Sequence, residues 1–210
     1  MRVSVLAGVA TLTLAAALPV GAAPAGATPP AGRVGIEVLN INGTGCKQGT
    51  AQVAVSLDGE AFTTVYSTYL AQTGGKAREA HKVCRLNLRI NALAGFSAAI
   101  SHVDHRGFAA LAAGATAEQQ ASYRFHGSPT VGPVRHTFTG PYTDDWQATD
   151  TTPAGALIHG PCGKARNLDV DTELTVSAGA SQPGAVSYIA MDSTDGVAVT
   201  TYHLSWRRCT

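Results

Sequence analysis

The stretch Val83-Cys-Arg-Leu-Asn-Leu-Arg-Ile-Asn91 alternates apolar and polar side chains with a period of two. On an extended strand, one face would carry Cys84, Leu86, Leu88 and Ile90, and beyond Val83 the other face would carry Arg85, Asn87, Arg89 and Asn91. This pattern is typical of a strand with one buried and one solvated face. It also places Cys84 on the buried side, where a structural disulfide would lie.

The same period recurs along the chain. Leu168, Val170, Leu174 and Val176 alternate with polar residues, and Ala198, Tyr202, Leu204 and Trp206 share one face of a run from Val197 to Cys209. Val186–Met191, the turn Asp192–Gly196 and this last run predict a hairpin. Shorter strands are expected at Val34–Leu39, Ala51–Leu57, Phe62–Tyr69, Phe96–Val103, Ser122–Phe125 and Val134–Thr139.

Gly and Pro separate these runs, and Ala109–Gln120 is the one stretch predicted to form a short helix. Many short strands with turns between them indicate an all-β fold, an antiparallel β-sandwich with at most one short helix.

The N-terminus predicts export. Arg2 precedes an apolar run from Val3 to Val20, and Ala25-Gly-Ala27 fits the small-x-small rule for signal peptidase. We therefore expect a signal peptide at 1–27, a flexible leader at 28–33 and a single domain at 34–210. A retained membrane anchor is the alternative, because the run is near the length that spans a bilayer. After cleavage we expect a secreted protein with no further membrane contact.

The charge balance excludes one class of partner. Removal of Arg2 from the 15 basic residues leaves 14, against 14 acidic residues. A neutral chain has no electrostatic footprint for nucleic acid.

The four cysteines, Cys46, Cys84, Cys162 and Cys209, lie in the predicted mature chain. An even count in an exported protein indicates two disulfides. Three pairings are possible and loop-closure entropy does not distinguish them. Our expectation is Cys46–Cys84 and Cys162–Cys209.

An ordered set of motifs resembles a known family. The set comprises Gly43-Thr-Gly-Cys46, Cys84 before its strand, Asp104-His-Arg-Gly107, Tyr123-Arg-Phe-His-Gly127, Gly140-Pro141, Pro161-Cys-Gly163 and Leu204-Ser-Trp-Arg-Arg-Cys209. In this order they resemble the domain-of-unknown-function 4360 family of small secreted proteins, over about Val34 to Cys209. The resemblance implies an exported, disulfide-bridged β domain and carries no assigned activity.

His102 and Asp104 are the candidate catalytic residues. On a strand they share a face, where a carboxylate could orient an imidazole as a base, whereas His105 would point the other way. The structural alternative is a polar strand end with Asp104 paired to Arg106.

Asp144, Asp145 and Trp146 form a candidate binding motif, expected in a loop within Gly140–Pro161. The Trp ring could stack on a sugar while the carboxylates accept hydroxyl hydrogen bonds. The alternative is a Trp that anchors the loop over the core.

The sequence predicts no metal site and no cofactor. His159-Gly-Pro-Cys162 could suggest zinc, but a disulfide is favoured for that cysteine in an exported chain. Asp192–Gly196 lacks the spacing of a calcium loop and is expected to be a plain turn. Asn42-Gly-Thr44 is a formal glycosylation sequon.

These observations favour a secreted, non-enzymatic β-sandwich for extracellular or cell-envelope use, which binds a cell-wall polysaccharide or another extracellular protein. The alternatives are a secreted hydrolase that uses His102 and Asp104, and a secreted inhibitor or effector that uses the Gly140–Pro161 segment.

Overall fold

The computed structural model describes residues 35–74, 79–191 and 199–209, so the predicted signal peptide, the leader and the Asp192–Gly196 turn lie outside the described residues. Within these ranges the regular secondary structure is strand, apart from a single turn of 3-10 helix. The elements are β1 (Gly35–Asn42), β2 (Ala51–Val55), β3 (Ala61–Tyr66), β4 (Leu70–Thr73), β5 (His81–Asn91), β6 (Phe96–Leu111), β7 (Thr116–Phe125), β8 (Val131–Thr139), β9 (Tyr142–Thr151), the single-turn 3-10 helix η1 (Ala154–Ala156), β10 (Arg166–Ser177), β11 (Ser187–Ala190) and β12 (Val199–Arg208).

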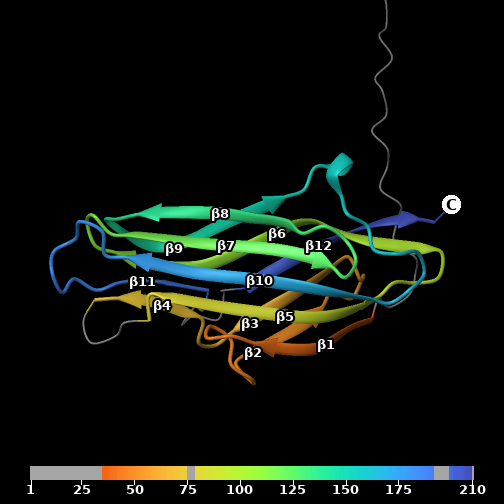
Figure 1. The fold of residues 1–210 in the computed structure, drawn as a ribbon, viewed down its shortest axis with the longest axis horizontal. Coiled ribbons are helices and arrows are strands. Elements are labelled where there is room, and N and C mark those ends of the chain that lie inside the picture. Colours follow the sequence, from red (N-terminus) through yellow and green to blue (C-terminus); the bar gives the residue numbers. More distant parts are fainter. Residues whose placement is uncertain (1–34, 75–78, 192–198, 210) are drawn as a thin grey trace, which may run out of the picture.

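The strands form two antiparallel sheets that pack face to face (Figure 1). Sheet A has the order β1-β5-β10-β7-β8 and lies in front in Figure 1. Sheet B has the order β2-β3-β12-β6-β11-β4, with β9 paired to the remaining edge of β6. The predicted antiparallel β-sandwich is thus confirmed. No helix in the described part of the chain is long and apolar enough to cross a bilayer.

The period of two decides which side chains fill the core. Cys84, Leu86, Leu88 and Ile90 of β5 are at most 2% exposed, while Arg85 and Arg89 between them face solvent. Leu168, Val170, Leu174 and Val176 of β10 pack beside them in antiparallel register. The alternation in the sequence therefore marks the inner face of sheet A correctly.

Both disulfides have the expected pairing. Cys46–Cys84 joins the segment after β1 to β5, and both of its residues are fully buried. Cys162–Cys209 joins the segment before β10 to the end of β12. The Cys209 N–H donates to the Gly95 carbonyl and the Gly163 N–H to the Phe96 carbonyl, so this second bridge lies where β6 begins.

Two sequence predictions are wrong at the level of elements. Ala109–Gln120 is not a helix: its residues end β6 and begin β7, with Ala117 and Gln119 buried and Glu118 and Gln120 partly exposed. Ala, Glu and Gln are good helix formers, but intrinsic helix propensity is a weak determinant of structure, and pairing of β7 between β8 and β10 overrides it.

The predicted hairpin of Val186–Met191 with Val197–Cys209 is also wrong. β11 pairs with β4 and β6, whereas β12 pairs with β3 and β6. Because β9 occupies the opposite edge of β6, β11 and β12 follow one another along a single edge of that strand. They form one interrupted strand, not two strands that face each other.

The two disulfides should contribute unequally to stability. On the loop-entropy model, removal of either bridge costs about 4 kcal/mol. The double variant Cys46→Ala/Cys84→Ala should cost more than Cys162→Ala/Cys209→Ala, because it also leaves a cavity where two buried sulfur atoms packed. Urea unfolding of both variants measures this difference in unfolding free energy, provided that their m-values agree. A larger loss from Cys162→Ala/Cys209→Ala would contradict the expectation that the buried Cys46–Cys84 bridge is the more stabilising of the two.

Candidate functional site

A β-bulge in β6 exchanges the two faces of that strand. His203 of β12 lies opposite His102, and the next β12 residue, Leu204, lies opposite Ile100, so Ser101 is the extra residue. Before it, Ala98 and Ile100 belong to the core; after it, Val103, Ala109 and Leu111 do. The bulge thus turns His102 and Asp104 to the outer face of sheet B and His105 to the interior.

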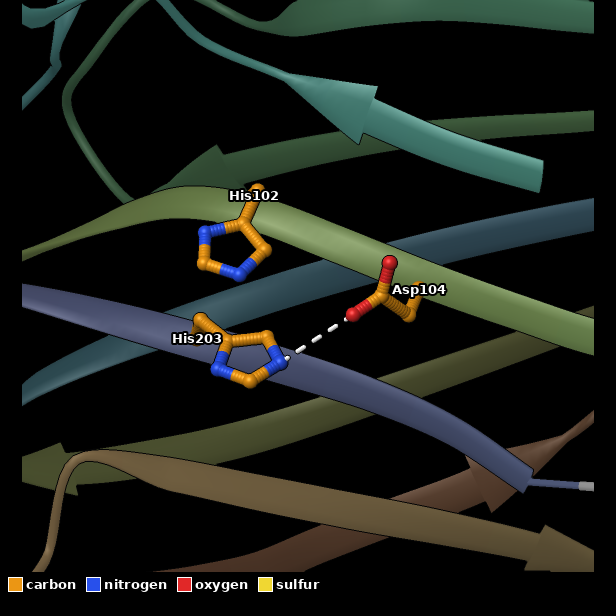
Figure 2. Close-up of side chains that lie close together, drawn as sticks. All are labelled: His102, Asp104 and His203. Atoms are coloured by element: carbon orange, nitrogen blue, oxygen red, sulfur yellow. Dashed lines mark ion pairs between the residues drawn. The ribbon is translucent and has the colours of Figure 1, made fainter.

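His102, Asp104 and His203 form a cluster on this outer face (Figure 2). One nitrogen or oxygen ligand atom from each of the three lies within 4.8 Å of the other two. The two imidazole rings stack, with their centroids 3.9 Å apart and their planes 10° from parallel. Asp104 Oδ2 lies 3.3 Å from His203 Nε2.

Neighbouring side chains fix the orientation of the cluster. The Thr149 hydroxyl of β9 donates to Asp104 Oδ1 at 2.6 Å. Ser101 Oγ lies 3.2 Å from His102 Nδ1 and donates to the His203 carbonyl at 3.1 Å. Because a carbonyl can only accept, the single hydroxyl proton of Ser101 goes to it, and Ser101 in turn accepts from Nδ1–H of His102. This arrangement leaves the lone pair of His102 on Nε2.

The protonation of the cluster follows from these contacts. The hydrogen bond from Thr149 lowers the pKa of Asp104, and the two histidines lower it further against the opposing effect of partial burial. Partial burial and the neighbouring His203 lower the pKa of His102, although Asp104 acts in the opposite direction. At neutral pH the cluster therefore contains a carboxylate and a neutral His102 ring.

The sequence prediction of a shared face for His102 and Asp104 agrees with the structure, and so does the opposite direction of His105. The expected partner of Asp104 was Arg106, but the ion pair in the structure is with His203. His203 was missed because it lies about one hundred residues away and its neighbours Tyr202 and Leu204 were assigned only to the core. The sequence signal that could have identified His203 is its position on the polar face of the strand predicted from Val197 to Cys209.

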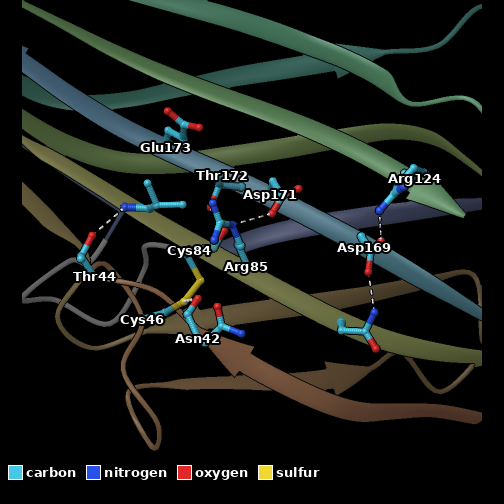
Figure 3. A network of polar contacts seen from close by, with 12 residues as sticks. Asn42, Thr44, Cys46, Cys84, Arg85, Arg124, Asp169, Asp171, Thr172 and Glu173 are labelled. Carbon is cyan, nitrogen blue, oxygen red and sulfur yellow. Dashed lines mark hydrogen bonds and ion pairs between the residues drawn. A yellow bond between two sulfur atoms is a disulfide. The ribbon is translucent and has the colours of Figure 1, made fainter. Parts of the chain in front are cut away.

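The outer face of sheet A differs from this cluster in its chemistry (Figure 3). There the carboxylates face guanidinium groups: Asp171 lies 3.5 Å from Arg85, and Asp169 lies 2.7 Å from Arg124. His126 also contacts Asp169, but no second imidazole joins that pair among the described residues. Sheet A thus carries a surface of paired charges, whereas sheet B brings two imidazoles to one carboxylate.

A second polar group lies inside the sandwich behind the cluster. Asp150 of β9 is 5% exposed, and its Oδ2 accepts from the Tyr123 hydroxyl at 2.6 Å and from His105 Nε2 at 3.2 Å. Its Oδ1 accepts from His136 Nε2 at 2.6 Å. His105 Nδ1 is buried without a partner among the described residues. Because a carboxylate oxygen only accepts, Nε2 of His105 carries the proton that it donates to Asp150.

Residues 32–209 match the family described as Domain of unknown function (DUF4360). The chain belongs to this family. A curated relative from Arthroderma benhamiae (strain ATCC MYA-4681 / CBS 112371) is 28% identical over 187 residues, which are 88% of this chain and 76% of the relative, and it is named "Uncharacterized secreted protein".

Among solved structures, the crystal structure of the enzymatically active domain of Bacteriophage CBA120 tailspike protein 4 is 10% identical over 81% of this chain. The TM-score is 0.25, and the match spans 19% of the tailspike chain. This likeness is too low to inform either fold or function.

The predicted binding motif of this DUF4360 protein lies elsewhere than expected. Asp144, Asp145 and Trp146 are in strand β9, not in a loop, and Trp146 is 4% exposed. Its ring covers Gly107, where a Cβ would lie 2.6 Å from Trp146 Cζ2, and it packs 5.2 Å from the Phe138 ring. The ring is thus part of the core and has no free face for a sugar, whereas both carboxylates remain exposed.

β9 was not predicted as a strand because Asp150 occupies an inward position, where the alternating pattern would require an apolar residue.

The disulfides decide whether Cys162 is free to bind zinc. Cys162 is bonded to Cys209, so it cannot be a thiolate ligand beside His159. The glycosylation sequon has an exposed Asn42 at the end of β1.

The buried Asp150 should stabilise the fold in a pH-dependent way. Burial opposes its ionisation, but the hydrogen bonds from His105, Tyr123 and His136 outweigh burial, so the pKa of Asp150 lies below its usual value. A lowered pKa in the folded state means that the contribution is complete above the unfolded pKa, near 3.9, and is lost as the pH falls through the folded value.

We expect Asp150→Asn to lose about 3 kcal/mol of unfolding free energy at pH 7, because the charge is removed and one of the two oxygen acceptors becomes an NH2 group that faces buried donors. The difference from wild type should shrink below about pH 4. Urea unfolding from pH 7 to pH 3 measures it, with the exposed Asp145→Asn as control. A difference that is constant across this range would contradict an ionised Asp150 in the folded protein.

Proposed function

We propose that this DUF4360 protein is an exported, non-enzymatic binding module, and that its binding site is the outer face of sheet B around His102, Asp104 and His203. The observation that carries the proposal is the convergence of these three side chains from β6 and β12 on an open sheet face. Two disulfides and a relative that is named as a secreted protein support the extracellular setting.

The position of the cluster favours binding over catalysis. An enzyme site usually lies in a concave pocket that limits access of water. The apolar hollow at one end of the sandwich contains none of the three cluster residues; its lining is Ile100, Tyr123, Arg124, Phe125, Pro129, Val131, Thr152, Ile158 and Leu168. The cluster is instead partly exposed on a sheet surface, where a ligand can reach it without a rearrangement of the backbone.

The hydrolase alternative finds less support in the contacts. A general base needs its imidazole oriented by the carboxylate and directed at a nucleophile. Asp104 bonds to His203, while His102 Nδ1 bonds to Ser101, whose own proton goes to a backbone carbonyl. The inhibitor or effector alternative keeps only part of its predicted loop, because Tyr142–Thr151 of the Gly140–Pro161 segment form strand β9.

The proposal is tested with tag-free chain that begins at Thr28, the residue after the predicted cleavage site. We expect a ligand from a panel of cell-wall polysaccharide fractions, oligosaccharides, extracellular proteins and metal ions to raise the thermal midpoint of the wild type. The rise should disappear in His102→Ala and His203→Ala and persist in His126→Ala. Chromogenic ester, glycoside, peptide and phosphate substrates should show no turnover.

Two outcomes would contradict the proposal. One is turnover by the wild type that His102→Ala abolishes, because this result would establish the hydrolase. The other is a ligand response that the His102 and His203 variants retain in full, because the binding site would then lie elsewhere on the molecule.

A further inference from the structure

We propose that His102, Asp104 and His203 bind one divalent transition-metal ion, of the kind represented by Zn²⁺, Ni²⁺ and Cu²⁺. This inference rests on the proposed function and names the class of ligand for the same site. Across the described residues, these are the only three His, Cys, Asp or Glu side chains whose ligand atoms all lie within 4.8 Å of one another.

The donor set selects the metal. Two imidazoles and one carboxylate suit zinc, copper and nickel, whereas calcium and magnesium prefer sites made of oxygen ligands. The two disulfides together contain all four cysteines, so no thiolate is available to bind the ion. We therefore expect transition metals to bind and Ca²⁺ and Mg²⁺ not to bind.

The backbone holds the ligands in place before any ion arrives. His102 and His203 are directly opposite each other in the antiparallel register, and Asp104 is two residues along the same face of β6. Strand positions are more rigid than loop positions, so the cost of ordering the ligands is already met by the sheet. The bulge at Ser101 supplies this register.

Outer contacts orient the ligand atoms in the way that metal sites require. Ligating histidines usually donate their second ring N–H to a neighbouring oxygen, and ligating carboxylates are themselves hydrogen-bonded. Here Nδ1 of His102 faces Ser101 Oγ, and Oδ1 of Asp104 accepts from Thr149. His102 Nε2 is thereby left for the ion, and Asp104 Oδ2 would exchange its contact with His203 Nε2 for the metal.

The stacked rings must change their orientation when an ion binds. A metal lies close to the plane of the imidazole that ligates it, so one ion cannot lie in the planes of two parallel rings 3.9 Å apart. At least one ring has to rotate about its side-chain torsions. The His203 side chain is 33% exposed and has room to do so. Three protein ligands also leave positions open for water or for a partner's donor.

Titration of metal-stripped, tag-free chain with Zn²⁺, followed by calorimetry, tests the inference. We expect one ion per chain. At a hundredfold excess of Zn²⁺ over the dissociation constant, the thermal midpoint should rise by roughly 5–10 °C. His102→Ala and His203→Ala should each weaken binding at least tenfold. Thr149→Val should weaken it about tenfold without abolishing it, as loss of an outer-shell contact does.

His126→Ala is the matched control, because His126 also contacts a carboxylate, Asp169, without a second imidazole beside it. Its affinity for Zn²⁺ should equal that of the wild type. Nuclear magnetic resonance of the wild type should show that Zn²⁺ shifts the ring protons of His102 and His203 and leaves those of His126 in place. This second readout remains decisive if an alanine variant fails to fold.

Three results would overturn the metal site: no binding of Zn²⁺, Ni²⁺ or Cu²⁺ below millimolar concentration, equal affinity in His203→Ala, or shifts confined to other histidines. The cluster would then be a structural imidazole pair only. If another ligand still depends on His102 and His203 in the thermal assay, the binding module stands and only the metal falls. If no ligand depends on them, both proposals fail.

Discussion

The single extra residue in β6, Ser101, is the constraint on which the rest of this structure depends. β6 is the longest strand and pairs along its length with β12, β11 and β9. Because side chains alternate strictly along a strand, one inserted residue exchanges the inward and outward sets beyond it. Without the bulge, His105 and Gly107 would face solvent, and His102 and Asp104 would face the core. The carbonyl of Ser101 accepts from Thr152 N–H, so the irregularity leaves this backbone group satisfied.

The bulge at Ser101 also places the surface cluster and the buried network on opposite faces of the same part of β6. On the outer side Asp104 faces His203 and Thr149, and on the inner side the next residue, His105, contacts Tyr123 and Asp150. β9 supplies Thr149 to one group and Asp150 to the other. Asp104 and His105 are consecutive on β6, and Thr149 and Asp150 are consecutive on β9. These two pairs therefore build a solvent-facing site and a buried polar network at the same point of the sandwich. A buried carboxylate at this position is costly unless all its partners are present, which fixes the pairing of β9 to β6.

Much of this fold could be predicted from local sequence because strong alternation marks the inner face of β5 and of β10. The β-sandwich followed from the strand pattern, and the presence of two disulfides followed from the cysteine count. The count did not distinguish the expected pairing from the other two, and the structure decides it. β7 was partly mistaken for a helix because its Ala, Glu and Gln residues carry no clear period, and β9 was missed because Asp150 and Asp144 interrupt the apolar pattern. In both cases long-range pairing, which a local pattern does not contain, decided the structure.

The candidate site was likewise predictable from local sequence only in part. His102 and Asp104 were predicted on one face of a strand because they are two residues apart. The third member, His203, and the support from Thr149 depend on strand order, and no short window of sequence encodes that order. Of the two interpretations of Trp146, packing against the core agrees with the structure. Local sequence could not decide between them for a related reason, because the burial depends on Gly107 of the neighbouring strand, which gives the ring room to lie flat.

Footprinting with diethyl pyrocarbonate, which modifies accessible imidazoles, tests the central claim most directly. The folded, unreduced protein is labelled briefly, and tandem mass spectrometry separates His102 from His105. The bulge predicts that His102 and His203 are modified, while His105, with no exposed surface, is protected until the protein unfolds. Modification of His105 in the folded protein as fast as that of His102 would show that the two faces of β6 are assigned wrongly.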